Sequence, residues 1–328
     1  MKSRVRITAL GVCLLFVAPA LADDGTAQLG AGGVVFAKSA DIRMAKEDLA
    51  ISPDTVAIRF EFANDGAAQD VVIAFPLPDL KLEDFYGNAI GTIGKDPVNF
   101  VGFTTTVDGK PVVAKVEQKA MLHGKNLSAL VRAAGLPLNL VAGDGADLLQ
   151  KLPSAKRAPL VKAGLIDGDN EYPAPLWTVQ TRYYWTQHFP AGKTVVIEHR
   201  YTPITGGMQW SATSAQDEPD QVKGFCMDAP VLARLKAMSA NPALRKPDPD
   251  SPPQAGGILY GEVTDYILST AATWKGPIGH FHLTLDKLDA RNVLSLCWPG
   301  LKKTTPTHFE FTADNFAPRQ DIHMLVLR

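Results

Sequence analysis

The chain has 328 residues, of which 46% are hydrophobic, and its 33 Lys and Arg residues nearly balance its 34 Asp and Glu residues. This length is enough for a large core and for two domains. The near-neutral charge argues against a nucleic-acid binder, because such a protein needs a basic face that also carries stacking aromatic residues.

Residues 1–22 have the three parts of a secretory signal peptide. Three basic residues lie in the first six positions, an apolar run follows to residue 21, and the small residues Ala20 and Ala22 precede two aspartates. Because the apolar run is too short for a stop-transfer anchor, we expect cleavage after Ala22, no membrane span in the mature chain, and a periplasmic or secreted location. A retained membrane anchor is the alternative. Cleavage would remove three cations and no acid, which moves the formal net charge from −1 to −4.

Residues 23–117 are predicted to form the first part of a β-domain. The strongest strand pattern runs from Val56 to Phe62, where large apolar residues alternate with smaller or charged ones. Asp108 and Gly109 have the composition of a two-residue hairpin turn. The glycine-rich run 29–36 precedes a strand, whereas a phosphate-binding loop would join a strand to a helix, so the context does not fit such a loop.

The spacing of apolar residues becomes helical in residues 118–175, as at Leu127, Leu130 and Val131. Glycine and proline residues interrupt this spacing repeatedly. We therefore expect two or three short helices inserted into the β-domain. They would serve either as a lid or partner surface, or simply as a cover on one face of a sheet.

Residues 176–215 are predicted to form an aromatic β-hairpin that completes the sheet. Between Trp177 and Phe189 the odd positions are mostly apolar and the even positions mostly polar, which is the pattern of a half-buried strand. Pro190 and Gly192 suit the turn, and residues 194–201 form the second arm.

The remaining chain is divided into two parts. Residues 216–255 should hold a helix from about Asp228 to Met238, with Asp228 as its N-cap, and a proline-rich linker, while Gly206 and Gly207 mark a loop before them. Residues 256–328 read as further β-strands. The fold class is therefore mainly β, with sandwich-like antiparallel sheets in one or two β-domains and a small helical insertion.

Two cysteines, Cys226 and Cys297, follow the signal segment. An even number of cysteines in an oxidising compartment favours one disulfide, and two separate buried thiols are the alternative.

Two short motifs carry candidate metal ligands. His280 and His282 alternate on a predicted strand, so both imidazoles would lie on one face, although no third ligand can be named. Asp167, Asp169 and Glu171 alternate in a glycine-containing loop as calcium ligands do, but the loop lacks the later bidentate glutamate of an EF-hand. Solvent-facing histidines and a plain polar turn are the alternatives, and we predict no cofactor.

Arg182 and Tyr184 lie on the more polar face of the first hairpin arm. With the nearby Trp177, Tyr183 and Trp185 they could form a stacking platform for a sugar or a peptide, although core packing is the commoner role of such aromatic residues.

Four blocks of sequence resemble a known family: AGGVVFAKSADIRMAKEDLAIS, YYWTQHFPAGKTVVIEHRYTPITGG, WKGPIGHFHLTLDK and SLCWPGLKKTTPTHFEFTADNFAPRQDIHMLVL. They are similar to the bacterial secreted proteins grouped as the domain of unknown function 4424 family. The resemblance covers nearly the whole mature chain and implies an envelope or periplasmic protein of mainly β architecture, with no activity or cofactor to carry over. It also implies that Cys226 and Cys297 stand at positions where the family has cysteines, which supports the disulfide.

These observations together predict a non-enzymatic binding or envelope-interaction module, with an unknown envelope protein or polysaccharide as its partner. The alternative is a secreted hydrolase that acts on an envelope polymer through dispersed carboxylates and histidines. A deep cleft with paired carboxylates would favour the enzyme, and an exposed aromatic surface or sheet edge would favour binding.

Overall fold

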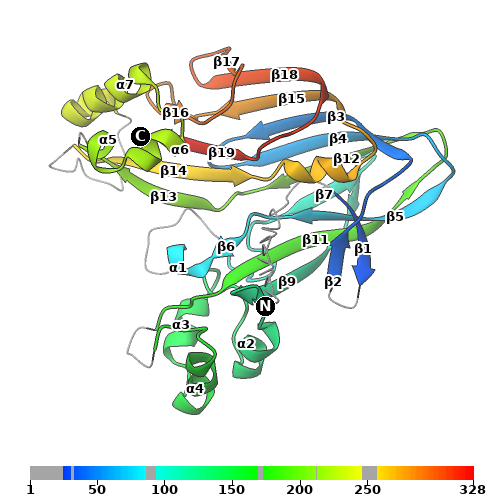
Figure 1. Ribbon diagram of the computed structural model, residues 1–328, viewed down its shortest axis with the longest axis horizontal. Helices are drawn as coiled ribbons and strands as arrows, with labels where there is room; N and C mark the ends of the chain where they lie inside the picture. Colours follow the sequence, from blue (N-terminus) through cyan, green and yellow to red (C-terminus); the bar gives the residue numbers. More distant parts are fainter. Residues whose placement is uncertain (1–24, 31–32, 86–93, 169–172, 212, 246–256) are drawn as a thin grey trace, which may run out of the picture.

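The structure, a computed structural model, describes residues 25–328 except 31–32, 86–93, 169–172, 212 and 246–256, so the predicted signal segment lies outside the described residues. Strands make up 42% of the described residues and helices 20%, which confirms the mainly β class. The strands of the described residues form three sheets (Figure 1).

An eight-stranded sheet has the order β17-β18-β15-β3-β4-β12-β7-β8. Its neighbouring strands are antiparallel, except that β3 and β15 are parallel. The strong alternation predicted around Val56 forms β4, where Phe60 and Phe62 are fully buried. The strands are β3 (Ile42–Ile51), β4 (Val56–Asn64), β7 (Thr104–Val107), β8 (Lys110–Val112), β12 (Thr194–Tyr201), β15 (Ile278–Asp286), β17 (Lys302–Lys303) and β18 (His308–Phe316).

A seven-stranded sheet has the order β10-β9-β11-β5-β1-β2, and β6 also pairs with β11. The long strand β11 pairs with β5 on one side and with β9 and β6 on the other. The strands are β1 (Gly25–Gly30), β2 (Gly33–Phe36), β5 (Gln69–Pro76), β6 (Leu80–Lys81), β9 (Lys115–Leu122), β10 (Lys125–Asn126) and β11 (Thr178–Phe189).

A four-stranded sheet has the order β13-β14-β19-β16, and each pair in it is antiparallel. Its strands are β13 (Thr205–Trp210), β14 (Leu259–Tyr266), β16 (Val293–Ser295) and β19 (Ile322–Leu327). Gly206 and Gly207 were expected in a loop, but they lie inside β13, because pairing with β14 outweighs the weak strand propensity of glycine. β13 is one of the two edge strands of this sheet among the described residues, and β16 is the other.

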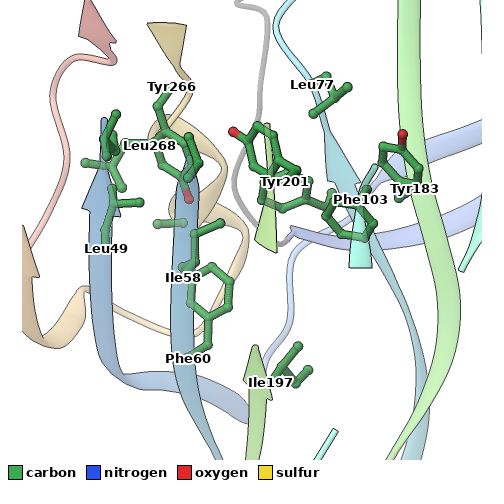
Figure 2. Packing of buried hydrophobic residues seen from close by; sticks show 14 of the residues in the cluster. Leu49, Ile58, Phe60, Leu77, Phe103, Tyr183, Ile197, Tyr201, Tyr266 and Leu268 are labelled. Carbon is green, nitrogen blue, oxygen red and sulfur yellow. The ribbon is translucent and has the colours of Figure 1, made fainter. Parts of the chain in front are cut away.

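The main core lies between the eight-stranded sheet and the other two sheets. Figure 2 shows Leu49, Ile58 and Phe60 of β3 and β4 in the same cluster as Tyr201, Tyr266 and Tyr183, which come from strands of all three sheets. Packing of sheet faces in this way is the sandwich-like arrangement that the alternation predicted.

Two smaller cores lie under the helices. One joins α2 (Ser128–Ala134), α3 (Gly145–Gln150) and α4 (Ser154–Lys162) to Trp177 and β11 at the bottom of Figure 1. The other joins the four-stranded sheet to the helices at the left of the figure. These are α5 (Ser214–Asp217), α6 (Pro219–Gly224) and α7 (Ala229–Ala240), and the short helices α1 (Leu82–Phe85), η1 (Pro242–Leu244) and η2 (Ser269–Thr273) complete the set.

The two arms of the predicted aromatic hairpin do not pair with each other, so that interpretation was wrong. β11 belongs to the seven-stranded sheet and β12 to the eight-stranded sheet. The turn between them is held by Asn64, whose side-chain amide donates to the carbonyls of Ala67 at 2.8 Å and Phe189 at 3.0 Å. The chain therefore passes from one sheet to the other at this turn.

Two local predictions are confirmed. Asp108 and Gly109 have φ values of 48° and 76° and join β7 to β8, as a tight hairpin turn with two left-handed residues requires. The side chain of Asp228 accepts a hydrogen bond from the backbone N–H of Val231 at 2.9 Å, which caps α7.

Candidate functional site

The predicted disulfide is present. Cys226 and Cys297 are bonded across a sequence separation of 71, with their Cα atoms 5.0 Å apart. Cys226 follows α6 and Cys297 follows β16, so the bond fastens the α6–α7 connection to the four-stranded sheet. Ser295 strengthens the same junction, because its hydroxyl donates to the Phe225 carbonyl at 2.9 Å.

His280 and His282 lie on β15, and each imidazole has an acidic neighbour. His280 Nδ1 lies 2.7 Å from Asp314 Oδ1. His282 lies 3.6 Å from Asp48 and 3.9 Å from Glu310. Within the described residues, no group of three or more His, Cys, Asp or Glu side chains could hold a metal ion. The two histidines therefore remain candidate metal ligands, and each has a carboxylate from a neighbouring strand close to its imidazole.

The predicted calcium loop lies largely outside the described residues, because Asp169 and Glu171 are not among them. The third candidate, Asp167, accepts a hydrogen bond from the backbone N–H of Ala174 at 2.8 Å. This bond closes the base of the loop. The calcium interpretation stays a prediction.

Arg182 and Tyr184 do lie on one face of β11, but both side chains have partners there. Arg182 forms an ion pair with Glu117 at 3.2 Å and lies over the ring of Phe36 at 5.7 Å. Tyr184 packs against a small cluster that contains Ala27. A stacking platform at these residues stays a prediction, and a ligand would have to bind there without displacing these contacts.

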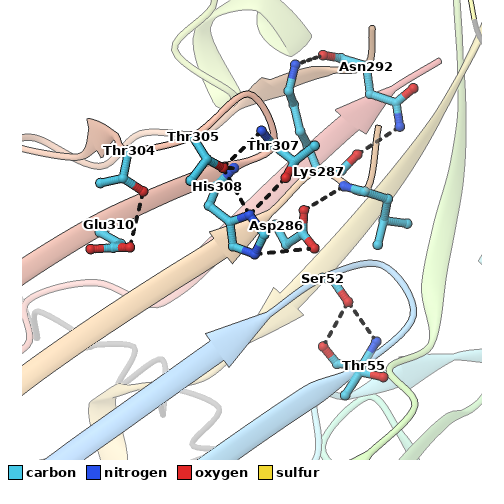
Figure 3. Close-up of polar contacts among 11 residues, drawn as sticks. Ser52, Thr55, Asp286, Lys287, Asn292, Thr304, Thr305, Thr307, His308 and Glu310 are labelled. Atoms are coloured by element: carbon cyan, nitrogen blue, oxygen red, sulfur yellow. Dashed lines mark hydrogen bonds and ion pairs between the residues drawn. The ribbon is translucent and has the colours of Figure 1, made fainter. Parts of the chain in front are cut away.

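Lys287, which lies outside the predicted sites, has an amine with a shifted pKa. Its side chain is 5% exposed, and burial lowers the pKa of its ammonium, with the nearby cations of Lys303 and Arg234 acting in the same direction. The amine donates to the carbonyls of Ala290, at 2.8 Å, and Asn292. Figure 3 shows Lys287 and Asn292 in the turn after β15. Because its partners are backbone carbonyls of one tight turn, this lysine has a structural role.

A cavity of about 300 Å³ lies where the three sheets meet, and no sequence motif points to it. One wall comes from the end of β5, β6 and α1, and the other comes from β13, β14 and the segment between β12 and β13. The lining residues are mostly apolar on the inside and include four charged residues: Leu77, Pro78, Asp79, Leu80, Lys81, Asp84, Phe100, Val101, Tyr201, Pro203, Ile204, Gly206, Gly207, Val263 and Asp265.

The charged residues of the cavity lie at its exposed rim. Asp79 accepts a hydrogen bond from the Gln180 side chain at 3.0 Å, and Asp265 forms a hydrogen bond with Nδ1 of His323. With Asp84, these residues bring three carboxylates to the rim, against the single ammonium of Lys81. The rim is therefore acidic.

Tyr201 is the buried polar residue of the cavity. It is 4% exposed, and its hydroxyl has no hydrogen-bond partner within the part of the chain that the structure describes. Burial is the main cause that raises the pKa of this phenol, so the hydroxyl keeps its proton. Tyr183 differs, because its hydroxyl donates to Asn99 Oδ1 at 2.8 Å. Figure 2 shows Tyr201 and Leu77, which both line the cavity, with Tyr183 beyond them.

The signals that could have located the cavity are weak. Pro78 and Pro203 stop β-structure on its two walls, and Gly206 and Gly207 keep side chains out of one of them. Each of these residues has an ordinary explanation as a turn or loop former, and they are far apart in the sequence. Only the fold brings them together.

Among the described residues, no helix is both long and apolar enough to cross a membrane. The fold and the cavity define a mainly β, disulfide-bridged protein with an acidic-rimmed pocket at a junction of sheets. By its sequence the chain belongs to the family described as "Domain of unknown function (DUF4424)", whose pattern matches residues 22–325.

No curated protein matches the sequence. Among solved structures, the chain is similar to one titled as a "putative nutrient binding protein" from Legionella pneumophila, with 15% identity and a TM-score of 0.41. That match covers 88% of this chain and 68% of the other. Similarity at this level does not transfer a ligand or a role to this chain.

Proposed function

We propose that the protein is an exported, non-enzymatic binding protein whose cavity takes a small cationic ligand. The signal-like composition of residues 1–22 supports export. The bond between Cys226 and Cys297 is of the kind that persists in oxidising compartments and supports the same location.

The hydroxyl of Tyr201 is the observation that carries the binding role. A buried hydroxyl without a partner costs about 1–3 kcal/mol, and folded proteins seldom retain such a group without a reason. Tyr201 lines the cavity, but its hydroxyl oxygen has almost no exposed surface, so a ligand would supply the missing hydrogen bond after a small shift of the neighbouring side chains. The phenol can both donate and accept, so it suits a ligand with either kind of polar group.

The rim selects for positive charge. Asp79, Asp84 and Asp265 outnumber Lys81, and the apolar walls behind them lower the local dielectric, which strengthens the attraction for an ammonium group. The volume of about 300 Å³ is at the small end of ligand sites and suits a molecule of a few heavy atoms to about a dozen.

Calorimetric titration of the mature protein tests this proposal, with butylammonium as the probe and butanol and butyrate as matched neutral and anionic controls. We expect saturable binding of butylammonium alone. The substitution Asp79→Asn should weaken it about tenfold, since it removes a rim charge and keeps the shape. Asp147→Asn is the control, because Asp147 is an exposed residue of α3 paired with Lys151. Equal binding of butyrate, or no binding of butylammonium, would refute the proposal.

The hydrolase that the sequence left as an alternative makes a different prediction. It requires that an ester or glycoside probe be consumed, and that Asp79→Asn or Asp265→Asn abolish the consumption. Binding without turnover supports the non-enzymatic role.

A further inference from the structure

The cavity opens beside the unpaired edge of β13. Among the described residues, β13 pairs only with β14, and its other edge has no strand partner. Gly207 belongs both to this edge strand and to the lining of the cavity. A ligand in the cavity is therefore next to backbone groups that a further strand could pair with.

The hydrogen-bond pattern of the sheet shows which groups of β13 point outward. Tyr260 and Arg328 exchange both backbone hydrogen bonds, at 3.1 and 2.8 Å, so Tyr260 faces β19. In an antiparallel sheet successive residues of a strand bond to opposite sides, so Gly261 and Val263 face β13. They are opposite Met208 and Gly206, respectively.

Gly207 and Gln209 alternate with those two residues, so their N–H and C=O groups point away from β14 toward the open edge. Both residues are exposed. The absence of a side chain at Gly207 leaves its backbone accessible from the cavity. The acidic cavity can attract a free amino group, and the outward backbone groups that follow it along β13 can pair with an extended backbone. Together they fit a peptide with a free amino terminus.

We propose that the cavity binds the amino-terminal end of an extended peptide, which continues along β13 as a parallel added strand. This inference rests on the proposed binding function and specifies its ligand. The ammonium of the first peptide residue lies among the rim carboxylates, and its side chain enters the apolar part of the cavity near Tyr201. The complementary charge of ammonium and rim, together with backbone pairing, gives affinity without a required sequence.

The pairing assigns a partner to each outward group. The carbonyl of the first peptide residue accepts from the N–H of Gly207. The third residue donates its N–H to the carbonyl of Gly207 and accepts from the N–H of Gln209. The N–H of the second peptide residue points away from β13 and makes no bond to it. This alternation gives a test that needs only the unaltered protein.

The test measures binding of trialanine amide to the mature protein by calorimetry, beside butylammonium. Two further probes are trialanine amides with a single N-methyl group, at the second or the third residue. We expect trialanine amide to bind at least about tenfold more tightly than butylammonium, because it adds backbone hydrogen bonds. Methylation at the third residue should remove most of this gain, and methylation at the second should leave it within about threefold.

Two further measurements address the amino terminus and the strand edge. Acetylation of the peptide's amino group should weaken binding at least about tenfold, because it removes the charge that the rim attracts. The substitution Gly207→Pro removes an outward N–H without touching the bonds to β14, so it should weaken the peptide more than butylammonium. Circular dichroism checks that this variant is folded, and the methylated probes decide the question if it is not.

The outcomes separate the two proposals. If butylammonium binds but trialanine amide binds no more tightly, the peptide inference is refuted and the cationic pocket stands. Equal losses from the two N-methyl positions would also refute strand pairing. If neither probe binds, both proposals fail.

Discussion

Trp177 donates its indole N–H to the carbonyl of Leu138 at 2.8 Å, and this buried bond joins the start of β11 to the helical segment. The indole is fully buried in the cluster beneath α2, α3 and α4. That cluster is separate from the main core between the sheets. Trp177 therefore links the helical segment to the strand that follows it.

We expect Trp177→Phe to lower the free energy of unfolding by about 2–3 kcal/mol, through the lost hydrogen bond and the smaller volume of the ring. If residues 118–175 form an insertion of their own, as we propose, the loss should be local. Hydrogen exchange should then speed up in α2 and α4 and remain slow in β3 and β4. Trp185→Phe is the control, because Trp185 belongs to the main core. Equal exchange gains in strands and helices would contradict a separate insertion.

The bond between Cys226 and Cys297 gives a second prediction. Its sequence separation of 71 means that, in the chain-entropy model, removing it costs about 4 kcal/mol. The double variant Cys226→Ser with Cys297→Ser should show this loss in urea unfolding, whereas a reducing agent should shift only the wild type and not the variant. The variant should still fold, since the hydrogen bond from Ser295 to Phe225 keeps the junction in place. If neither the double substitution nor the reducing agent moved the midpoint of urea unfolding, the bond would not constrain the unfolded chain.

Lys287 gives a prediction about pH. Its folded-state pKa is lowered below the ordinary 10.5, so between the two values the unfolded chain binds more protons than the folded one. Stability contributed by this group therefore rises as pH increases toward 10.5. The variant Lys287→Met cannot show that rise.

The measurement is the difference in unfolding free energy between wild type and Lys287→Met at several pH values from neutral to about 10.5. The unfolding free energy of the wild type should rise relative to that of the variant as pH increases. Lys302→Met is the control, because it removes an exposed lysine of β17 instead of a buried one. A wild-type advantage that falls with pH would mean that the carbonyls of Ala290 and Asn292 stabilise the charged form enough to outweigh burial.

Local features of the fold could be predicted because short-range chemistry determines them. The left-handed turn at Asp108, the cap at Asp228 and the alternation in β4 each depend on a few neighbouring residues. The choice of partner strand does not depend on neighbouring residues alone. The pattern in β11 and β12 is the same whether they pair with each other or with strands of two sheets, so the hairpin prediction failed there.

The candidate site could not be predicted for a related reason. Leu77, Tyr201 and Val263 line one cavity from three distant parts of the chain, and each looks like an ordinary core residue in its own segment. The parallel pairing of β3 with β15 is equally long-range, because it joins residues 46–51 to residues 280–285. Nothing in either local sequence distinguishes a parallel partner from an antiparallel one.

Tyr201 and Tyr183 of the main core lead to the last prediction, because of these two only Tyr183 has a hydrogen-bond partner for its hydroxyl among the described residues. Tyr201→Phe removes a hydroxyl that has no hydrogen-bond partner among the described residues, so the free energy of unfolding should be unchanged or higher by up to about 3 kcal/mol. Tyr183→Phe removes one of the two hydrogen bonds that Asn99 Oδ1 accepts, the other coming from the backbone N–H of Phe103, and should lower the free energy of unfolding by about 1 kcal/mol.

Binding should show the opposite order. Tyr201→Phe should weaken butylammonium or trialanine amide several-fold, because the ligand loses a hydrogen bond worth about 1 kcal/mol. Tyr183 does not line the cavity, so Tyr183→Phe should bind both probes as the wild type does. Urea unfolding and calorimetry on the same preparations provide both readouts. If Tyr201→Phe proved less stable than Tyr183→Phe and bound the probes normally, the Tyr201 hydroxyl would be part of the core and would have no role in the site.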